Sequence, residues 1–211
     1  MSVREAYDAW AATYDTDRNA TRDLDRAVTE ATLSGLRCGT IIELGCGTGK
    51  NTAFLARLGT RVLALDFSRA MLARARRKVS AAHVGFAVAD LTAPWPCADR
   101  AADLVAGNLV CEHIAALPFV CGEAHRCLAA GGRLFVCELH PFRQYLGTQA
   151  RFRRDQDDIA IPAFVHHVSD FLAAAGGAGF TLVELREWWD GDDRGAPPRL
   201  VSFLWKKERG G

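Results

Sequence analysis

The 211-residue sequence predicts an α/β fold: a doubly wound, mostly parallel seven-stranded sheet with a C-terminal antiparallel hairpin and an N-terminal helical cap. Three observations predict it. Short apolar strand-like runs alternate with helical patterns between residues 36 and 139, which is typical of a parallel sheet. One run leads into a glycine-rich turn at 45–49. Two further β-rich runs, 181–189 and 199–205, follow the last helical pattern and indicate a hairpin.

The composition is that of an ordinary soluble globular domain, with 49% hydrophobic and 24% charged residues. We expect a single domain over 1–211, because a chain of this length can bury a sizeable core. The net charge of +1 gives no global electrostatic reason to expect a nucleic-acid or membrane partner. No apolar run approaches the roughly 20 residues that span a bilayer, and residues 1–5 lack the apolar region of a signal peptide.

Cysteine and histidine spacing gives no sign of a metal site. The seven cysteines are odd in number and include no Cys-x-x-Cys pair, so we expect reduced core thiols of a cytoplasmic protein. His166 and His167 are adjacent, and neighbouring residues on a helix point about 100° apart, so the pair cannot readily chelate one ion. We therefore expect no metal.

The N-terminal segment predicts two helices. Tyr7, Trp10 and Tyr14 share one helix face by their spacing. Residues 15–19 break that pattern, and a second helix is expected at about 21–33 before Ser34-Gly35. The aromatic residues could simply pack this segment onto the rest of the domain, or could close over a ligand; the two roles are compatible.

The glycine turn is the feature around which the chain is organised. A buried strand, Ile41-Ile42-Glu43-Leu44, precedes Gly45-Cys46-Gly47-Thr48-Gly49, and a helix is expected at 52–58. Glycines let a backbone adopt positive φ and approach a ligand closely. The spacing differs from the G-x-G-x-x-G of dinucleotide folds, since Lys50 stands where the third glycine would be, and it is too short for a P-loop.

Acidic residues follow the next two predicted strands. The strand at 61–65 ends in Asp66, which lies 21 positions after Gly45, and a carboxylate there can accept hydrogen bonds from both hydroxyls of a ribose. Ser68 is expected to cap a helix over 69–79. The strand at 83–88 is followed by Asp90, which could instead cap a turn before Pro94.

These features resemble the class I S-adenosylmethionine-dependent methyltransferases. Residues 43–49 are similar to the first motif of that family and residues 65–68 to its second, and the resemblance covers about residues 5–205. It implies the Rossmann-like methyltransferase fold, with S-adenosyl-L-methionine as cofactor and S-adenosyl-L-homocysteine as product. In this family the acid after the third strand receives the adenine amino group, and the next backbone N–H bonds a ring nitrogen, which implies these roles for Asp90 and Leu91.

The motifs, the strand ends and the resemblance together predict a cofactor site. We expect it to include Tyr14, Glu43, Gly45, Cys46, Gly47, Gly49, Asn51, Asp66, Phe67, Asp90, Leu91 and Asn108. Asn108 enters this set because it lies near the C-terminal end of the strand predicted at 103–110, and ligands bind at strand ends in open α/β sheets.

Two histidines are candidates for a catalytic base. His140 directly follows the strand at 133–139 and can titrate near neutrality, although it could merely bond substrate or cap a loop. His113 follows the strand predicted at 103–110, and it could equally be a helix-start residue. Between them lies a helix expected at 115–129 and ended by Ala130-Gly131-Gly132.

The stretch from His140 to Pro162 is too long for a bare turn, and we interpret 140–163 as a substrate lid. Within the resemblance, 1–35 is the helical cap, 36–139 the cofactor-binding core, and 164–211 the last helix and terminal hairpin. Candidate substrate contacts are Tyr7, Trp10, Arg18, Phe142, Arg143 and Tyr145.

The sequence therefore predicts an enzyme of secondary or cofactor metabolism that methylates a small molecule, at oxygen or nitrogen. A macromolecular methyltransferase acting on tRNA or a peptide is an alternative, but it would need a charged docking surface. Only the basic stretches 74–78 and 151–154 hint at such a surface. A non-catalytic module that binds S-adenosylmethionine is another. We expect a monomer or homodimer in the cytoplasm with no nucleic-acid or membrane partner.

Overall fold

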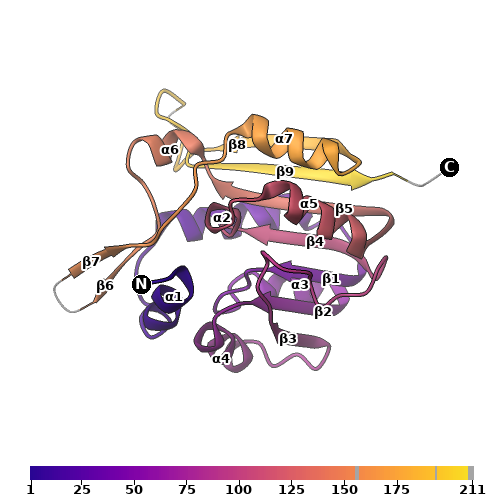
Figure 1. Cartoon of the computed structure of the whole chain (residues 1–211), viewed down its shortest axis with the longest axis horizontal. Helices are drawn as coiled ribbons and strands as arrows, with labels where there is room; N and C mark the ends of the chain where they lie inside the picture. Colours follow the sequence, from indigo (N-terminus) through magenta and orange to yellow (C-terminus); the bar gives the residue numbers. More distant parts are fainter. Residues whose placement is uncertain (155–156, 193, 209–211) are drawn as a thin grey trace.

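One seven-stranded sheet dominates the computed structural model, which describes residues 1–154, 157–192 and 194–208. Its strand order is β3-β2-β1-β4-β5-β9-β8, with β1 to β5 parallel and β9 antiparallel to both β5 and β8 (Figure 1). The strands are β1 (Cys38–Leu44), β2 (Gly59–Asp66), β3 (Val84–Val88), β4 (Ala102–Asn108), β5 (Leu128–Leu139), β8 (Phe180–Trp188) and β9 (Leu200–Lys207). This architecture confirms the predicted fold class.

Helices cover both faces of the sheet. α2 and α3 pack on one face, and α5 and α7 pack on the other. Because both faces are covered, neighbouring residues of a central strand are both buried: in β1, Ile41 joins the α2–α3 side and Ile42 the α5–α7 side. The helices are α1 (Val3–Trp10), α2 (Ala20–Leu33), α3 (Thr52–Leu58), α4 (Arg69–Lys78), the 3-10 helix η1 (Cys111–His113), α5 (Leu117–Cys127), α6 (Pro141–Tyr145) and α7 (Val168–Gly177).

The strand order reverses between β1 and β4, which places their carboxyl ends, with that of β2, at one edge of the sheet. Ligands bind at such a switch point in open α/β sheets. Within the described residues, no helix combines the length and the apolar character that crossing a membrane would require.

The boundary between α5 and β5 corrects one prediction. The helix predicted to end at Gly131-Gly132 ends at Cys127, and β5 already begins at Leu128, which pairs with Ala102. The register of β4 and β5 then shifts between Ala102 and Leu104. Gly131 has φ of +80°, and a Cβ on Gly132 would lie 2.9 Å from the Ala129 carbonyl oxygen. The glycines therefore serve a strand irregularity rather than a helix end.

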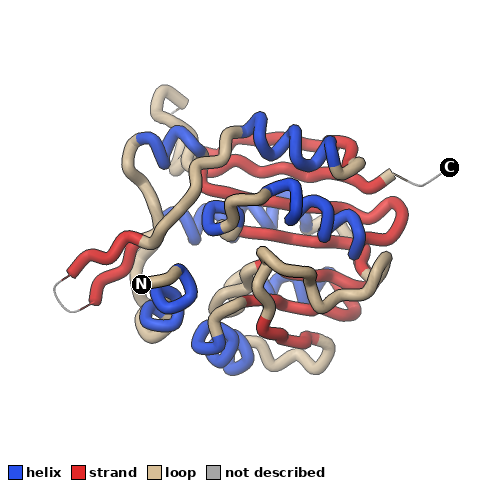
Figure 2. Tube along the Cα trace, in the orientation of Figure 1, coloured by secondary structure: helices blue, strands red, loops and turns tan. Residues whose placement is uncertain are grey.

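The segment predicted as a lid loop contains regular structure. It holds α6 and a two-stranded hairpin, β6 (Arg151–Arg154) with β7 (Asp157–Ala160), which extends from the sheet beside α1 (Figures 1 and 2). The rings of Trp10 and Phe152 stack with centroids 5.8 Å apart, within a buried cluster that includes Ile161. The hairpin and α1 thus share a small core of their own. Residues 155 and 156 of the predicted lid lie outside the described residues, as does Asp193 of the turn predicted between β8 and β9.

Candidate functional site

The turn after β1 has the backbone that its glycines allow. Gly45 and Gly47 have φ of +62° and +53°, a region that L-residues with side chains rarely adopt. A Cβ on Gly45 would lie 2.5 Å from Val110, so the turn packs closely against the chain after β4. A Cβ on Gly47 would meet no atom within 4 Å. The turn therefore exposes its backbone to open space at Gly47.

Asp66, at the end of β2, ties this turn to its neighbour strand. Its Oδ2 accepts the Gly47 N–H at 2.8 Å, and its Oδ1 accepts the Ser68 N–H at 2.8 Å. Burial raises the pKa of Asp66 to about 6, although both N–H groups oppose that rise. The carboxylate is thus fixed in place and faces the same cavity as the glycine turn.

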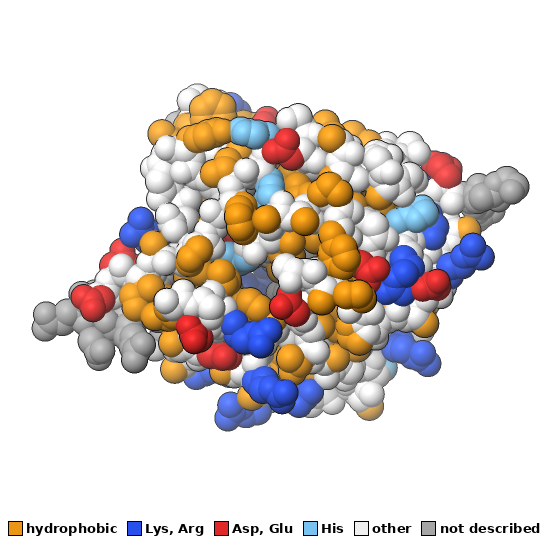
Figure 3. Space-filling model, viewed as in Figure 1, with side chains coloured by type: hydrophobic (Ala, Val, Ile, Leu, Met, Phe, Trp, Pro, Cys, Tyr) orange, Lys and Arg blue, Asp and Glu red, His pale blue; other side chains and the backbone are white. Residues whose placement is uncertain are grey.

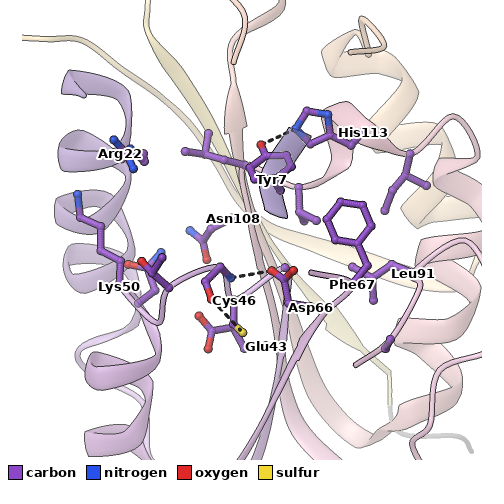
Figure 4. Close-up of a pocket in the computed structure, with 18 of the residues that line it drawn as sticks. Tyr7, Arg22, Glu43, Cys46, Lys50, Asp66, Phe67, Leu91, Asn108 and His113 are labelled. Atoms are coloured by element: carbon purple, nitrogen blue, oxygen red, sulfur yellow. Dashed lines mark hydrogen bonds between the residues drawn. The ribbon is translucent and has the colours of Figure 1, made fainter. Parts of the chain in front are cut away.

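A cavity lies among the glycine turn, α1, α2, the carboxyl ends of β2 and β4, and η1. It appears as a hollow near the centre of the face in Figure 3, with hydrophobic side chains around it. Figure 4 shows Arg22 on α2 at one side, and Phe67 and Leu91 at the other. At its base Glu43 is buried, and its Oε2 accepts the Thr52 hydroxyl at 2.6 Å. Burial raises the pKa of Glu43 to about 8.

Tyr7 and His113 meet over one side of the cavity. The Tyr7 hydroxyl lies 2.8 Å from His113 Nε2, and His113 Nδ1 lies 3.0 Å from the Pro162 carbonyl oxygen. A carbonyl oxygen only accepts, so Nδ1 carries the proton and the neutral ring accepts the Tyr7 hydroxyl at Nε2. Burial lowers the pKa of His113, which favours this neutral form. The imidazole is thus held with its basic nitrogen toward the cavity (Figure 4).

The comparisons agree on one family. A profile described as "Methyltransferase domain" matches residues 42–136. An uncharacterized methyltransferase of Emericella nidulans is 29% identical over 97% of this chain and 85% of its own length. A demethylmenaquinone methyltransferase of Tropheryma whipplei is 26% identical over 72% of this chain and 61% of its own length.

Two solved methyltransferase structures share this fold. A structure of an S-adenosylmethionine-dependent methyltransferase from Mesorhizobium loti is 18% identical, covers 85% of this chain and 96% of its own, and has a TM-score of 0.71. A structure of DhpI in complex with S-adenosylhomocysteine is 21% identical, covers 97% of this chain and 94% of its own, and has a TM-score of 0.73.

The chain is similar in sequence to methyltransferases, and its fold is that of S-adenosylmethionine-dependent methyltransferases. The cavity of this chain suits a ligand such as the S-adenosylhomocysteine of the DhpI structure, because the turn is open beside Gly47 and the buried amide oxygens of Asn51 and Asn108 have no hydrogen-bond partner among the described residues.

The fold brings most of the predicted cofactor residues to the cavity. Of that set, only Gly49 does not line it; its Cβ position instead faces Ala75 and Val79 at 3.3 Å, so Gly49 allows α4 to pack against the turn. The predicted residues that line the cavity are Tyr14, Glu43, Gly45, Cys46, Gly47, Asn51, Asp66, Phe67, Asp90, Leu91 and Asn108.

The structure corrects the choice of His140 as first candidate for the base. His140 Nδ1 accepts the Phe142 N–H at 3.2 Å, where it caps α6, and Nε2 donates to Glu187 Oε1 at 3.0 Å. The ring is buried and does not line the cavity. Both ring nitrogens are occupied in holding α6 against β8, so neither is free to accept a proton from a ligand in the cavity.

Five of the six predicted substrate contacts also lie away from the cavity, and Tyr7 alone lines it. Trp10 is buried against the hairpin, and its indole N–H donates to Asp17 at 2.8 Å. Phe142 and Tyr145 are exposed on α6. Arg143 pairs with Asp190 at 3.3 Å, and Arg18 is exposed.

Arg22 and Asp25 on α2 are among the cavity residues that the sequence did not predict. Arg22 donates to the carbonyls of Tyr14 and Asp17, and its guanidinium lies 4.0 Å from the centre of the Tyr14 ring. The available signal was their spacing: charged residues at 22 and 25 share the buried helix face with Val28 and Leu33.

Proposed function

We propose that this methyltransferase transfers the methyl group of S-adenosylmethionine to an oxygen or nitrogen of a small-molecule acceptor. The observation that carries the proposal is the fixed tautomer of His113, whose Nε2 faces the cavity and accepts the Tyr7 hydroxyl at 2.8 Å. An acceptor hydroxyl or amine would replace that hydroxyl as the donor to Nε2.

The cofactor would be held by the residues predicted for it. Asp66 would accept from the ribose hydroxyls, Asp90 and Leu91 would bond the adenine, and the turn at Gly45 and Gly47 would admit the methionine end. When bound, S-adenosylmethionine supplies a methyl group on a cationic sulfur that leaves as a neutral thioether. The protein's task is then alignment of the nucleophile with that methyl group.

His113 would act as the general base. As the new carbon–oxygen or carbon–nitrogen bond forms, the acceptor's proton passes to Nε2, while Nδ1 keeps its proton for the Pro162 carbonyl. The Glu112 carboxyl Oε1 lies 3.7 Å from Nε2, and would stabilise the resulting imidazolium when ionised. Burial raises the pKa of Glu112 to about 7, so it can exchange a proton near neutrality.

A small acceptor is supported by the cover over the cavity. Tyr7 on α1 and Pro162, which follows the β6–β7 hairpin, both contact His113. Together they restrict the space beside His113 in the cavity. The demethylmenaquinone methyltransferase among the relatives carries a name that refers to a small molecule. The seven cysteines are free and five of them are buried, which suits the cytoplasm that we propose as its location.

The test is a turnover assay in which S-adenosylhomocysteine formation is followed with a panel of phenols, alcohols and amines. With an acceptor in hand, His113→Gln should lower kcat by about 100-fold and leave the affinity for S-adenosylhomocysteine unchanged. His140→Gln is the matched control and should retain kcat. Full activity of His113→Gln would contradict the assignment, and turnover of tRNA or a peptide in place of the panel would contradict the acceptor class.

A further inference from the structure

Three elements place polar side chains around one buried carboxylate. Asp25 on α2 accepts the Asn51 amide at 2.9 Å through Oδ2, and the Asn108 amide at 2.6 Å through Oδ1. Asn51 directly precedes α3, and Asn108 ends β4. All three residues line the cavity, and Figure 4 shows Asn108 between α2 and the glycine turn.

The contacts fix which way each amide points. A carboxylate accepts and cannot donate, so both asparagines must turn their NH₂ groups toward Asp25. Thr29 reinforces this orientation. The Thr29 hydroxyl donates to the Asp25 backbone carbonyl oxygen at 2.8 Å, and the Thr29 hydroxyl oxygen accepts the Asn108 amide N–H at 2.8 Å. A reversed Asn108 amide would therefore lose two hydrogen bonds and set its oxygen against two acceptors.

The orientation leaves two acceptors without donors. Asn51 Oδ1 and Asn108 Oδ1 are buried and have no hydrogen-bond partner among the described residues. Buried polar atoms are ordinarily paired, so two such oxygens beside one cavity indicate donors that come with the ligand. An ammonium group carries three donors and no acceptor, and its charge is favoured beside a buried carboxylate.

We propose that Asp25 is a positioning residue that makes this end of the cavity selective for an ammonium group, by holding the amide oxygens of Asn51 and Asn108 toward the ligand. The group is the α-ammonium of the cofactor's methionine end. This inference rests on the proposed placement of the cofactor in the cavity. Asp25 acts through the two asparagines and through its charge, and it needs no contact with the transferred methyl group.

The test compares two ligands that share the adenosine and the thioether. S-Adenosylhomocysteine has the amino-acid end, and 5′-methylthioadenosine lacks it. In Asp25→Asn, residue 25 offers one oxygen and one NH₂, so only one neighbouring amide can keep its orientation. Calorimetric titration should show S-adenosylhomocysteine binding weakened by about tenfold or more, with methylthioadenosine binding unchanged.

Two further variants make the result specific. Glu30 lies on the same helix as Asp25 and pairs with Arg26 at 3.1 Å and with Arg57 at 3.8 Å. The Glu30→Gln variant should therefore leave the affinities for both ligands unchanged. Thr29→Val has nearly the shape of threonine and removes one acceptor from Asn108 without altering the cavity lining. It should produce a smaller loss of the same selective kind, and it decides the question if Asp25→Asn does not fold.

Equal weakening of both ligands would show a merely structural role and overturn the inference, as would unchanged S-adenosylhomocysteine binding in both the Asp25 and Thr29 variants. With either result, the proposed placement of the cofactor would still hold if the wild-type protein binds both ligands. Wild-type protein that binds neither ligand would contradict that placement, and this inference with it.

Discussion

Asp66 is a single carboxylate on which both the turn geometry and the proposed ribose contact depend. To accept from two backbone N–H groups and from ribose hydroxyls, it must be ionised. Burial raises its pKa to about 6, so the ionised fraction falls as the pH drops below that value. The affinity for S-adenosylhomocysteine should therefore fall by about tenfold between pH 7.5 and pH 5.

Calorimetric titration at several pH values checks this expectation. Asp66→Asn should bind weakly throughout, because an amide offers one acceptor atom instead of two, and its affinity should no longer change over this pH range. A wild-type affinity that stays constant down to pH 5, or a variant that keeps the full pH dependence, would remove Asp66 from the binding site.

The position of a residue was predictable where it follows from the neighbouring residues in the sequence. Gly45, Gly47 and Asp66 follow strands whose apolar residues are readable, so their place at one sheet edge was predictable. Asp25 reaches the cavity only because α2 packs beside β4, a tertiary contact that the sequence does not display. His140 was misassigned because Glu187, which lies 47 positions later, fixes its ring away from the cavity.

At the scale of elements, the β6–β7 hairpin and α1 form one unit over the cavity. Phe152 stacks on Trp10 and is buried, so Phe152→Ala should leave a cavity between the two elements. A buried Phe→Ala change typically costs about 3–5 kcal/mol. Because this small core is separate from the main sheet cores, the loss should appear as local opening.

Hydrogen exchange measured by mass spectrometry locates that opening. In Phe152→Ala, exchange should become faster in α1 and in the described part of the hairpin, and stay unchanged in β1 and β4. Phe142→Ala is the matched control, because Phe142 is 60% exposed on α6 and should alter exchange in neither region. Unchanged exchange in α1 of the Phe152 variant would show that the hairpin does not hold that helix.

The hairpin itself was not predictable from pattern. β6 and β7 have four residues each, too few for a period-two alternation to stand out from a charged loop. The end of α5 was misplaced for a different reason. Gly131 and Gly132 suggested a helix end, but pairing of Leu128 with Ala102 starts the strand earlier. Strand pairing overrode the local signal in that case, whereas α3 occupies the predicted range of 52–58.

The whole molecule carries buried acids whose protonation links pH to stability. Burial raises the pKa values of Glu43 and Glu138 to about 8. Between pH 6.5 and 8 the folded state therefore holds protons that the unfolded state has released. Stability is then greatest at the lower pH and falls as the pH rises through the folded pKa, by up to about 1.4 kcal/mol per pH unit for each group. Burial lowers the pKa of His113, so its contribution has the opposite sign, and it fades above pH 6.5 as the unfolded histidine loses its proton.

Urea unfolding at pH 6.5, 7.2 and 8 tests this expectation. In Glu138→Gln the amide oxygen can still accept the Val110 and Cys111 N–H groups, which Glu138 Oε1 accepts at 3.0 and 2.9 Å. The free energy of unfolding should therefore depend less on pH in this variant than in the wild type. The substitution Glu30→Gln, at a half-buried surface position, should retain the wild-type slope. An equal slope in Glu138→Gln would show that Glu138 is ionised in the folded protein.

The fold was predictable at this scale because alternating strands and helices, a glycine turn and a terminal hairpin all indicate the same sheet. The central claim is that the glycine turn at the edge of this sheet binds S-adenosylmethionine. Calorimetric titration with S-adenosylhomocysteine and, in parallel, NAD tests it most directly, using wild type and a Gly47→Val variant shown to be folded by circular dichroism. We expect S-adenosylhomocysteine to bind the wild type at one site, NAD not to bind, and Gly47→Val to lose binding. Binding of NAD without S-adenosylhomocysteine, or full affinity in Gly47→Val, would contradict the account.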